Sequence, residues 1–100
     1  MAKRLTVTNT RDSYQTLWYF QTNPPKNTAL DEWLENNSDK VTFHYDILND
    51  AYTQVLQYTF ADDVIAEEFA TFAASGDLGG AMDDYHASVG ITSTRVITDL

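Results

Sequence analysis

Residues 41–60, VTFHYDILNDAYTQVLQYTF, decide the fold that the sequence predicts. Apolar and polar side chains alternate on both sides of Asn49 and Asp50, as they do in two antiparallel strands that bury one face. Asparagine and aspartate tolerate the positive φ angles of a two-residue hairpin turn. We therefore predict a hairpin of strands 41–48 and 51–60, in which Phe43 faces Leu56.

The predicted register sorts the side chains of the hairpin onto two different faces. One face is apolar, and the other is mostly polar and carries Thr42, His44, Asp46, Thr53, Val55 and Gln57. A slip of one residue would exchange the two faces, so burial of the apolar face specifies the pairing. The hairpin therefore predicts an antiparallel sheet that is covered by helices on one side only.

A helix is predicted directly after the hairpin, at about residues 62–75. Ile65, Phe69 and Phe72 recur there at the helical period. Asp62 and Asp63 lie at its first turn, where carboxylates favour the free backbone N–H groups. Gly76 is a plausible stop signal for this helix.

The remaining segments predict two more helices and three more strands. Alternation predicts strands at 5–9 and 91–98, and the aromatic-rich residues 15–21 predict a further strand. A loop through Pro24 and Pro25 is followed by a helix that opens at Thr28 in the style of a capping box. A short helix is predicted at 81–88.

These elements predict one compact α+β domain over residues 1–100. The expected architecture is an antiparallel sheet of about five strands with two or three helices on one face, in the order ββα-ββα-α-β. If residues 13–20 are helical instead, the order becomes βαββαβ, which is the ferredoxin-like plan.

The distribution of charge is the least ordinary feature of the sequence. The net charge is −9, and residues 41–94 hold nine acidic side chains with no lysine or arginine. Nucleic acids are bound through lysine and arginine, so this balance argues against direct nucleic-acid binding. The first hypothesis is therefore a non-enzymatic interaction or inhibitor protein that docks on a basic protein surface. The predicted contact residues are Asp62, Asp63, Glu67, Glu68, Asp77, Asp83 and Asp84.

Size and charge also fit a viral or mobile-element accessory protein, and we expect a cytoplasmic location. The chain has no cysteine, which excludes disulfides and thiolate metal sites. No apolar run is long enough for a membrane span. We predict no catalytic residue, metal or cofactor.

Two places in the sequence offer weaker alternatives for chemistry. His44 and Asp46 share the polar face of the hairpin, but no nucleophile can be placed beside them. Asp83 and His86 share a helix face and could contribute to a cation site with other carboxylates, although no known metal motif is present.

The second hypothesis is a dimeric α+β domain that binds a small ligand or acts as an enzyme. Its pocket would lie between sheet and helices and would use Trp18, His44, Tyr45 or Tyr58. Residues 17–20 (LWYF) would make both faces of their predicted strand apolar. One face then needs a cover, which favours a homodimer.

Overall fold

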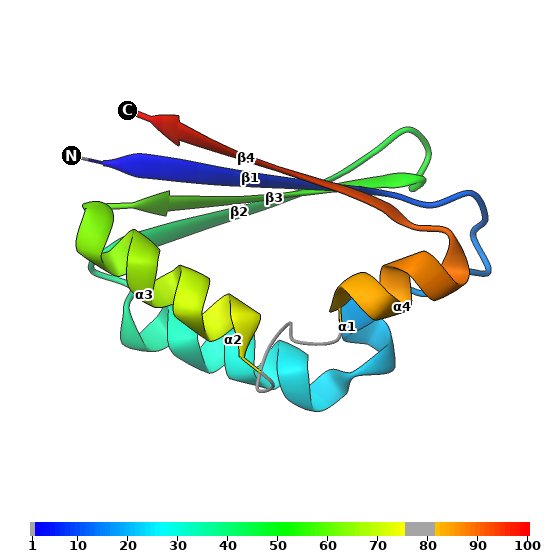
Figure 1. Cartoon of the computed structure of the whole chain (residues 1–100), viewed down its shortest axis with the longest axis horizontal. Helices are drawn as coiled ribbons and strands as arrows, with labels where there is room; N and C mark the ends of the chain where they lie inside the picture. Colours follow the sequence, from blue (N-terminus) through cyan, green and yellow to red (C-terminus); the bar gives the residue numbers. More distant parts are fainter. Residues whose placement is uncertain (1, 76–81) are drawn as a thin grey trace.

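The computed structural model describes residues 2–75 and 82–100. Its elements are β1 (Lys3–Thr10), α1 (Tyr19–Thr22), α2 (Pro24–Asn36), β2 (Val41–Leu48), β3 (Thr53–Phe60), α3 (Asp63–Ala74), α4 (Met82–Val89) and β4 (Thr92–Asp99). The strands form one antiparallel sheet in the order β2-β3-β1-β4. All the helices lie on the same side of that sheet, with α2 and α3 at one end and α1 and α4 at the other (Figure 1).

The fold class and the one-sided helix layer agree with the prediction, whereas the predicted order of elements does not. The described residues form four strands, and the order β1-(α1-α2)-β2-β3-(α3-α4)-β4 follows the alternative βαββαβ plan. Each of its two crossover segments is a pair of helices. The expected fifth strand and the ββα-ββα-α-β order are therefore not found.

The missing strand is the one that was predicted at residues 15–21. Arg11 holds this segment in a turn, because its guanidinium donates to the backbone oxygen of Thr16 (2.7 Å) and lies 4.5 Å from the ring centroid of Trp18. The backbone N–H of Trp18 then donates to Oε1 of Gln21 (2.8 Å), at the start of α1. The consecutive aromatic residues thus lead into a helical turn. They do not form a strand with two apolar faces, so no second cover for such a strand is required.

The two prolines begin a helix and do not form the predicted loop. Helix α2 starts at Pro24, four residues before the expected start at Thr28. Proline is well suited to this position because the first turn of a helix leaves its N–H groups without intrahelical partners.

The predicted hairpin forms, and its strand residues lie on the predicted faces of the sheet, but its turn differs from the prediction. Phe43 pairs with Tyr58, and Tyr45 with Leu56, a shift of two residues from the predicted register. A shift of two preserves which face each side chain occupies. The turn has four residues, and Asn49, Asp50 and Ala51 have φ angles of 53°, 54° and 72°.

The main core lies between α2, α3 and the β2–β3 half of the sheet. Phe69 is central, with its ring centroid 4.5 Å from Tyr58, 5.1 Å from Trp33 and 5.4 Å from Phe60. Burial of these aromatic rings is the dominant stabilising contribution at this end. None of the helices in the described ranges is long and apolar enough to span a membrane.

Candidate functional site

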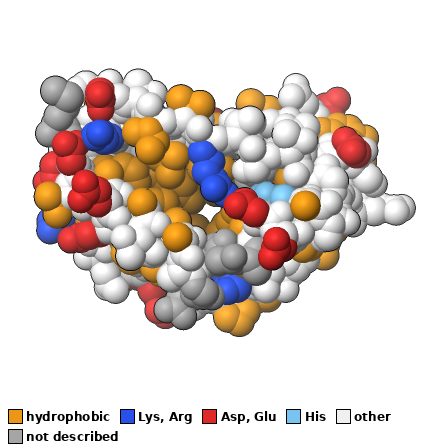
Figure 2. Space-filling view, in the orientation of Figure 1, with side chains coloured by type: hydrophobic (Ala, Val, Ile, Leu, Met, Phe, Trp, Pro, Cys, Tyr) orange, Lys and Arg blue, Asp and Glu red, His pale blue; other side chains and the backbone are white. Residues whose placement is uncertain are grey.

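An apolar groove lies between the sheet and helices α3 and α4. Its volume is about 710 Å³. Leu5 and Val7 of the central strand β1 form its floor together with Ile97 of β4, and none of the three is fully buried. Figure 2 shows the apolar hollow between the sheet and the helices, with acidic and basic side chains around it. Leu56, Tyr58 and Phe60 of β3 are thus buried under the helices, whereas the floor over β1 and β4 is open.

The wall of the groove that α3 forms consists mainly of alanine, a very small apolar residue. Four alanines of this helix face the groove, namely Ala66, Ala70, Ala73 and Ala74. The larger Phe69 points into the core and contributes to the same wall. Because alanine stops at Cβ, the wall leaves space where leucine or phenylalanine would fill it.

Charged side chains stand at the rim of the groove in opposite pairs. Lys3 Nζ lies 3.7 Å from Oδ1 of Asp63 and 3.4 Å from Oδ1 of Asp99. Arg95 donates to Oδ1 of Asp83 at 3.1 Å. The carboxylate of Asp63, and then that of Asp99, raises the pKa of Lys3, so its ammonium group stays charged. These pairs link β1 to α3 and α4 to β4 across the rim.

One end of the groove is polar because Asn9 takes the position that continues the row of Leu5 and Val7. Asn9 is 4% exposed and lines the groove. Its Nδ2 donates to Oε1 of Gln54 (2.8 Å), and Nε2 of Gln54 donates to the hydroxyl of Tyr45 (3.2 Å). This chain of amides crosses three strands and uses the nitrogen of Asn9, while its Oδ1 has no hydrogen-bond partner among the described residues.

His86 lies on α4 and does not line the groove. It is 5% exposed, and its Nδ1 has no hydrogen-bond partner in the described ranges. Burial lowers the pKa of His86; nearby Asp83 acts in the opposite direction, and Arg95 adds to the lowering. His86 is therefore a neutral imidazole at pH 7.

The predicted acidic contact residues separate into three groups. Asp63, Glu67 and Asp83 line the groove, and two of these three pair with cations. Asp62 caps α3, since its Oδ1 accepts the N–H of Ile65 at 3.0 Å. Glu68 and Asp84 are exposed and do not line the groove. Asp77 lies outside the described residues.

The predicted ligand-pocket residues are only partly brought together. Tyr58 lines the groove, and its burial raises the pKa of its hydroxyl well above the ordinary value. Tyr45 does not line the groove itself; its hydroxyl accepts a hydrogen bond from Gln54, which is bonded to Asn9 of the lining. Trp18 is buried against Arg11, outside the lining. His44 lies on the opposite face of the sheet, where its Nε2 is 2.9 Å from Oδ2 of Asp46 in an exposed pair.

The cation-site alternative at Asp83 and His86 has little structural support. Within the described ranges, no three histidine, aspartate or glutamate side chains are placed to hold one metal ion. Asp83 is paired with Arg95, and His86 is turned inward.

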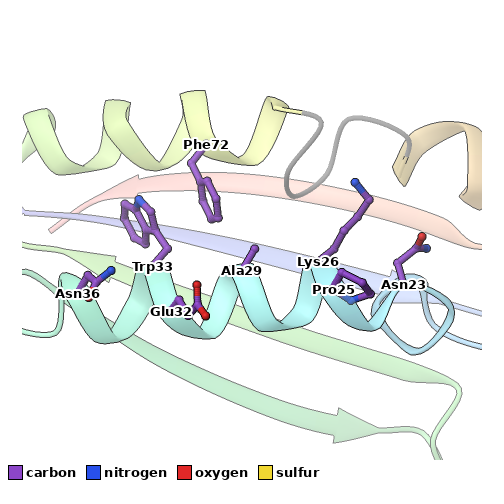
Figure 3. A pocket seen from close by; sticks show the side chains of 8 residues that line it. All are labelled: Asn23, Pro25, Lys26, Ala29, Glu32, Trp33, Asn36 and Phe72. Atoms are coloured by element: carbon purple, nitrogen blue, oxygen red, sulfur yellow. The ribbon is translucent and has the colours of Figure 1, made fainter.

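A second cavity of about 520 Å³ lies between α2 and the end of α3. Trp33 and Phe72 form its apolar side, with their rings nearly parallel and their centroids 5.6 Å apart. Lys26 and Glu32 supply charge on the α2 side (Figure 3). The ring pair belongs to the aromatic core, so this cavity is the weaker candidate.

The comparisons with known proteins bear on the fold of this chain. The sequence matches no protein-family model, and no curated protein matches it. Among solved structures, it is similar to a dimeric ferredoxin-like protein from an uncultured marine organism, with 14% identity, a TM-score of 0.63, and coverage of 99% of this chain and 96% of the other. This likeness shows the ferredoxin-like fold.

Two further structures cover nearly the whole chain at lower similarity. One is a protein of Mycobacterium tuberculosis, with 13% identity, a TM-score of 0.46, and coverage of 98% of this chain and 95% of the other. The other is an uncharacterized protein from Thermotoga maritima, with 10% identity, a TM-score of 0.39, and coverage of 99% and 100% respectively.

Proposed function

We propose that this chain binds a small, largely apolar organic molecule in the groove between the sheet and helices α3 and α4. The observation that carries the proposal is the open apolar floor on an inner strand of the sheet. Leu5 and Val7 remain partly exposed there, and Ile97 beside them is 68% exposed. Exposed apolar surface that is concave and rimmed by polar groups is typical of ligand sites.

The size and lining of the groove support a small organic ligand over a macromolecule. A volume of about 710 Å³ falls inside the range of roughly 300–1,000 Å³ found for small-molecule pockets. The alanine wall leaves room for a flat ring system above Leu5 and Val7. The paired rim charges leave little net attraction for an ionic ligand, so apolar contact would supply most of the affinity.

This proposal is tested by titrating the ¹⁵N-labelled chain with 2-methylnaphthalene and following its amide NMR spectrum. We expect shifts at Leu5, Val7 and Ile97. Ala70→Trp should fill the groove and abolish binding, while Thr71→Trp is the matched control, because Thr71 is exposed on the same helix and does not line the groove. Shifts elsewhere, or equal binding by the Ala70→Trp chain, would contradict the site.

We also propose that two copies pair through the sheet face that carries no helices. The similar protein from the marine organism is described as dimeric. Two chains of net charge −9 repel each other, and they can meet most easily where acids are fewest. On this face Asp46 is the one acidic side chain among the strand residues. The dimer was first expected from a doubly apolar strand at residues 17–20, and that reason is removed by the structure.

Docking on a basic protein surface is the second candidate function, and Glu68 and Asp84 favour it. Both are exposed and make no ion pair with the described residues. Such charges would act mainly on the association rate. Reversal of both charges to lysine should weaken capture of a basic partner at low salt. Capture that is indifferent to salt and to these substitutions would refute the candidate.

A further inference from the structure

The charges that line the groove do not fully cancel. Among the described residues, the lining contains three carboxylates and two cations. Lys3 pairs with Asp63, and Arg95 pairs with Asp83. The third carboxylate, that of Glu67, makes no ion pair with the described residues, and residues 41–94 hold no lysine or arginine that could supply one. The groove therefore keeps one negative charge without a partner in the described ranges.

Glu67 lies on the side of α3 that forms the wall of the groove. It follows Asp63 by four residues and precedes Ala70 and Ala74 by three and seven, a spacing that places all four on one side of a helix. All four line the groove, and all four are exposed. A ligand that lies against the alanines can thus reach the carboxylate of Glu67 from the groove.

An unpaired carboxylate beside an apolar floor discriminates between ligands by their charge. A carboxylate accepts hydrogen bonds and an ammonium group donates up to three, and a bond between two such ionised groups is stronger than one between neutral groups. An anionic ligand would be repelled by Glu67 and by the net charge of −9. The charges of Lys3 and Arg95 are balanced within their own pairs, so Glu67 sets the sign of the preference.

We infer that the ligand of the groove is an organic amine, whose ammonium group pairs with Glu67 while its apolar body lies on Leu5 and Val7. This inference rests on the proposed function and names the class of ligand. Apolar contact with the floor still supplies most of the affinity, because an ion pair that stays in contact with solvent contributes little. The carboxylate instead selects among ligands of the same shape, in favour of the cation.

Three naphthalene derivatives of similar shape test this selection. 2-Naphthylmethylamine carries an ammonium group at neutral pH, 2-naphthylmethanol carries a hydroxyl group in its place, and 2-naphthoate carries a carboxylate. We expect the amine to bind about threefold more tightly than the alcohol at low salt, as an exposed ion pair allows, and the carboxylate to bind most weakly. The preference for the amine should shrink as salt is added. Binding is measured by titration calorimetry, and the amide shifts of Glu67 and Ala70 locate it.

Two neighbouring glutamates of α3 assign the preference to the groove. Glu67→Gln should abolish the preference for the amine over the alcohol. Glu68→Gln is the matched control, since Glu68 is exposed on the same helix but does not line the groove. Each substitution removes one negative charge from the helix surface and keeps a good helix former, so the two variants differ in where the charge is lost. Glu68→Gln should therefore retain the preference of the parent chain.

The outcomes separate the inference from the proposed function. If 2-naphthylmethanol binds in the groove at least as tightly as the amine, the amine is the wrong class of ligand and the apolar site stands. The inference is also wrong if Glu67→Gln leaves the preference unchanged, or if Glu68→Gln lowers it as much, because the preference would then come from the overall charge of the chain. If neither these compounds nor 2-methylnaphthalene binds in the groove, the proposed function itself is overturned.

Discussion

At the scale of single residues, Ala51 holds a backbone conformation that its side chain disfavours. Its φ angle of 72° lies in the left-handed region, which costs a residue with a Cβ about 1–2 kcal/mol. We expect Ala51→Gly to raise the free energy of unfolding by about 1 kcal/mol, since glycine relieves that strain but loses more chain entropy.

A change of this size should raise the melting temperature by roughly 4–8 °C in a domain of this length, as measured by circular dichroism. Ala87→Gly is the control, because Ala87 is exposed within α4, where glycine costs about 1 kcal/mol. A fall in stability for Ala51→Gly would contradict the left-handed conformation.

His86 makes the stability of the fold depend on pH below neutrality. Burial lowers its pKa from the ordinary value of 6.5, so the unfolded chain binds a proton at a higher pH than the folded chain does. The stability is therefore complete above about pH 6.5 and falls as the pH drops below it. We expect the urea midpoint to decrease between pH 7.5 and pH 5.5.

Substitution of His86 separates this effect from the titration of the carboxylates. His86→Gln should flatten the dependence on pH across that interval, because it removes the buried imidazole. An equal slope in this variant and in the parent chain would show that other groups are responsible.

At the scale of elements, Asp62 stabilises the start of helix α3, a role that does not depend on any partner protein. Its carboxylate accepts the Ile65 N–H at 3.0 Å, and loss of such a cap costs about 1 kcal/mol. We expect Asp62→Ala to lower the free energy of unfolding by that amount in urea titrations. Asp62→Asn should keep most of the stability, because asparagine caps equally well; equal losses in both would argue for a role of the charge.

The elements that were predicted correctly from the sequence are those whose conformation is determined by residues close to them in the chain. Alternation fixed the faces of residues 41–60, and helical spacing with Asp62 at the start located α3 almost to the residue. Residues 15–21 were misread as a strand because their conformation depends on Arg11, whose backbone N–H donates to the backbone oxygen of Tyr52 (2.9 Å) on the distant hairpin turn. A contact between residues 41 positions apart leaves no trace in local periodicity.

A pocket between sheet and helices was predicted with Tyr58 in its lining, but the rest of the groove's lining was not predicted, for a similar reason, although one signal was present. Asn9 continues the row of Leu5 and Val7, so a polar side chain takes a core-facing position, and that departure from alternation marks the polar end of the groove. The separation of α3 from α4, which exposes the floor, is a tertiary feature. Local patterns place Asp63, Glu67 and Asp83 only along the chain, and the fold then gathers them at one rim.

At the scale of the whole molecule, the two faces of the sheet have different chemistry. On the sheet face that carries no helices, nine of the sixteen strand positions are threonine. The acids of α3 and α4 lie on the helix side. A flat face of β-branched residues with little charge is suited to packing against its own copy. We expect the chain to sediment with the mass of two copies.

A single charge at the centre of that face should separate the proposed dimer. Thr8 lies on the inner strand β1, and Thr8→Glu would place two carboxylates in a desolvated interface, where unpaired charge is costly. We expect a monomer by sedimentation equilibrium, with an unchanged far-ultraviolet spectrum. Val64→Glu is the control, since Val64 is 64% exposed on α3, and this variant should stay dimeric although it carries the same added charge. A dimer that Thr8→Glu leaves intact would have to form through the helix layer or a sheet edge, and a monomeric parent chain would rule out the pairing altogether.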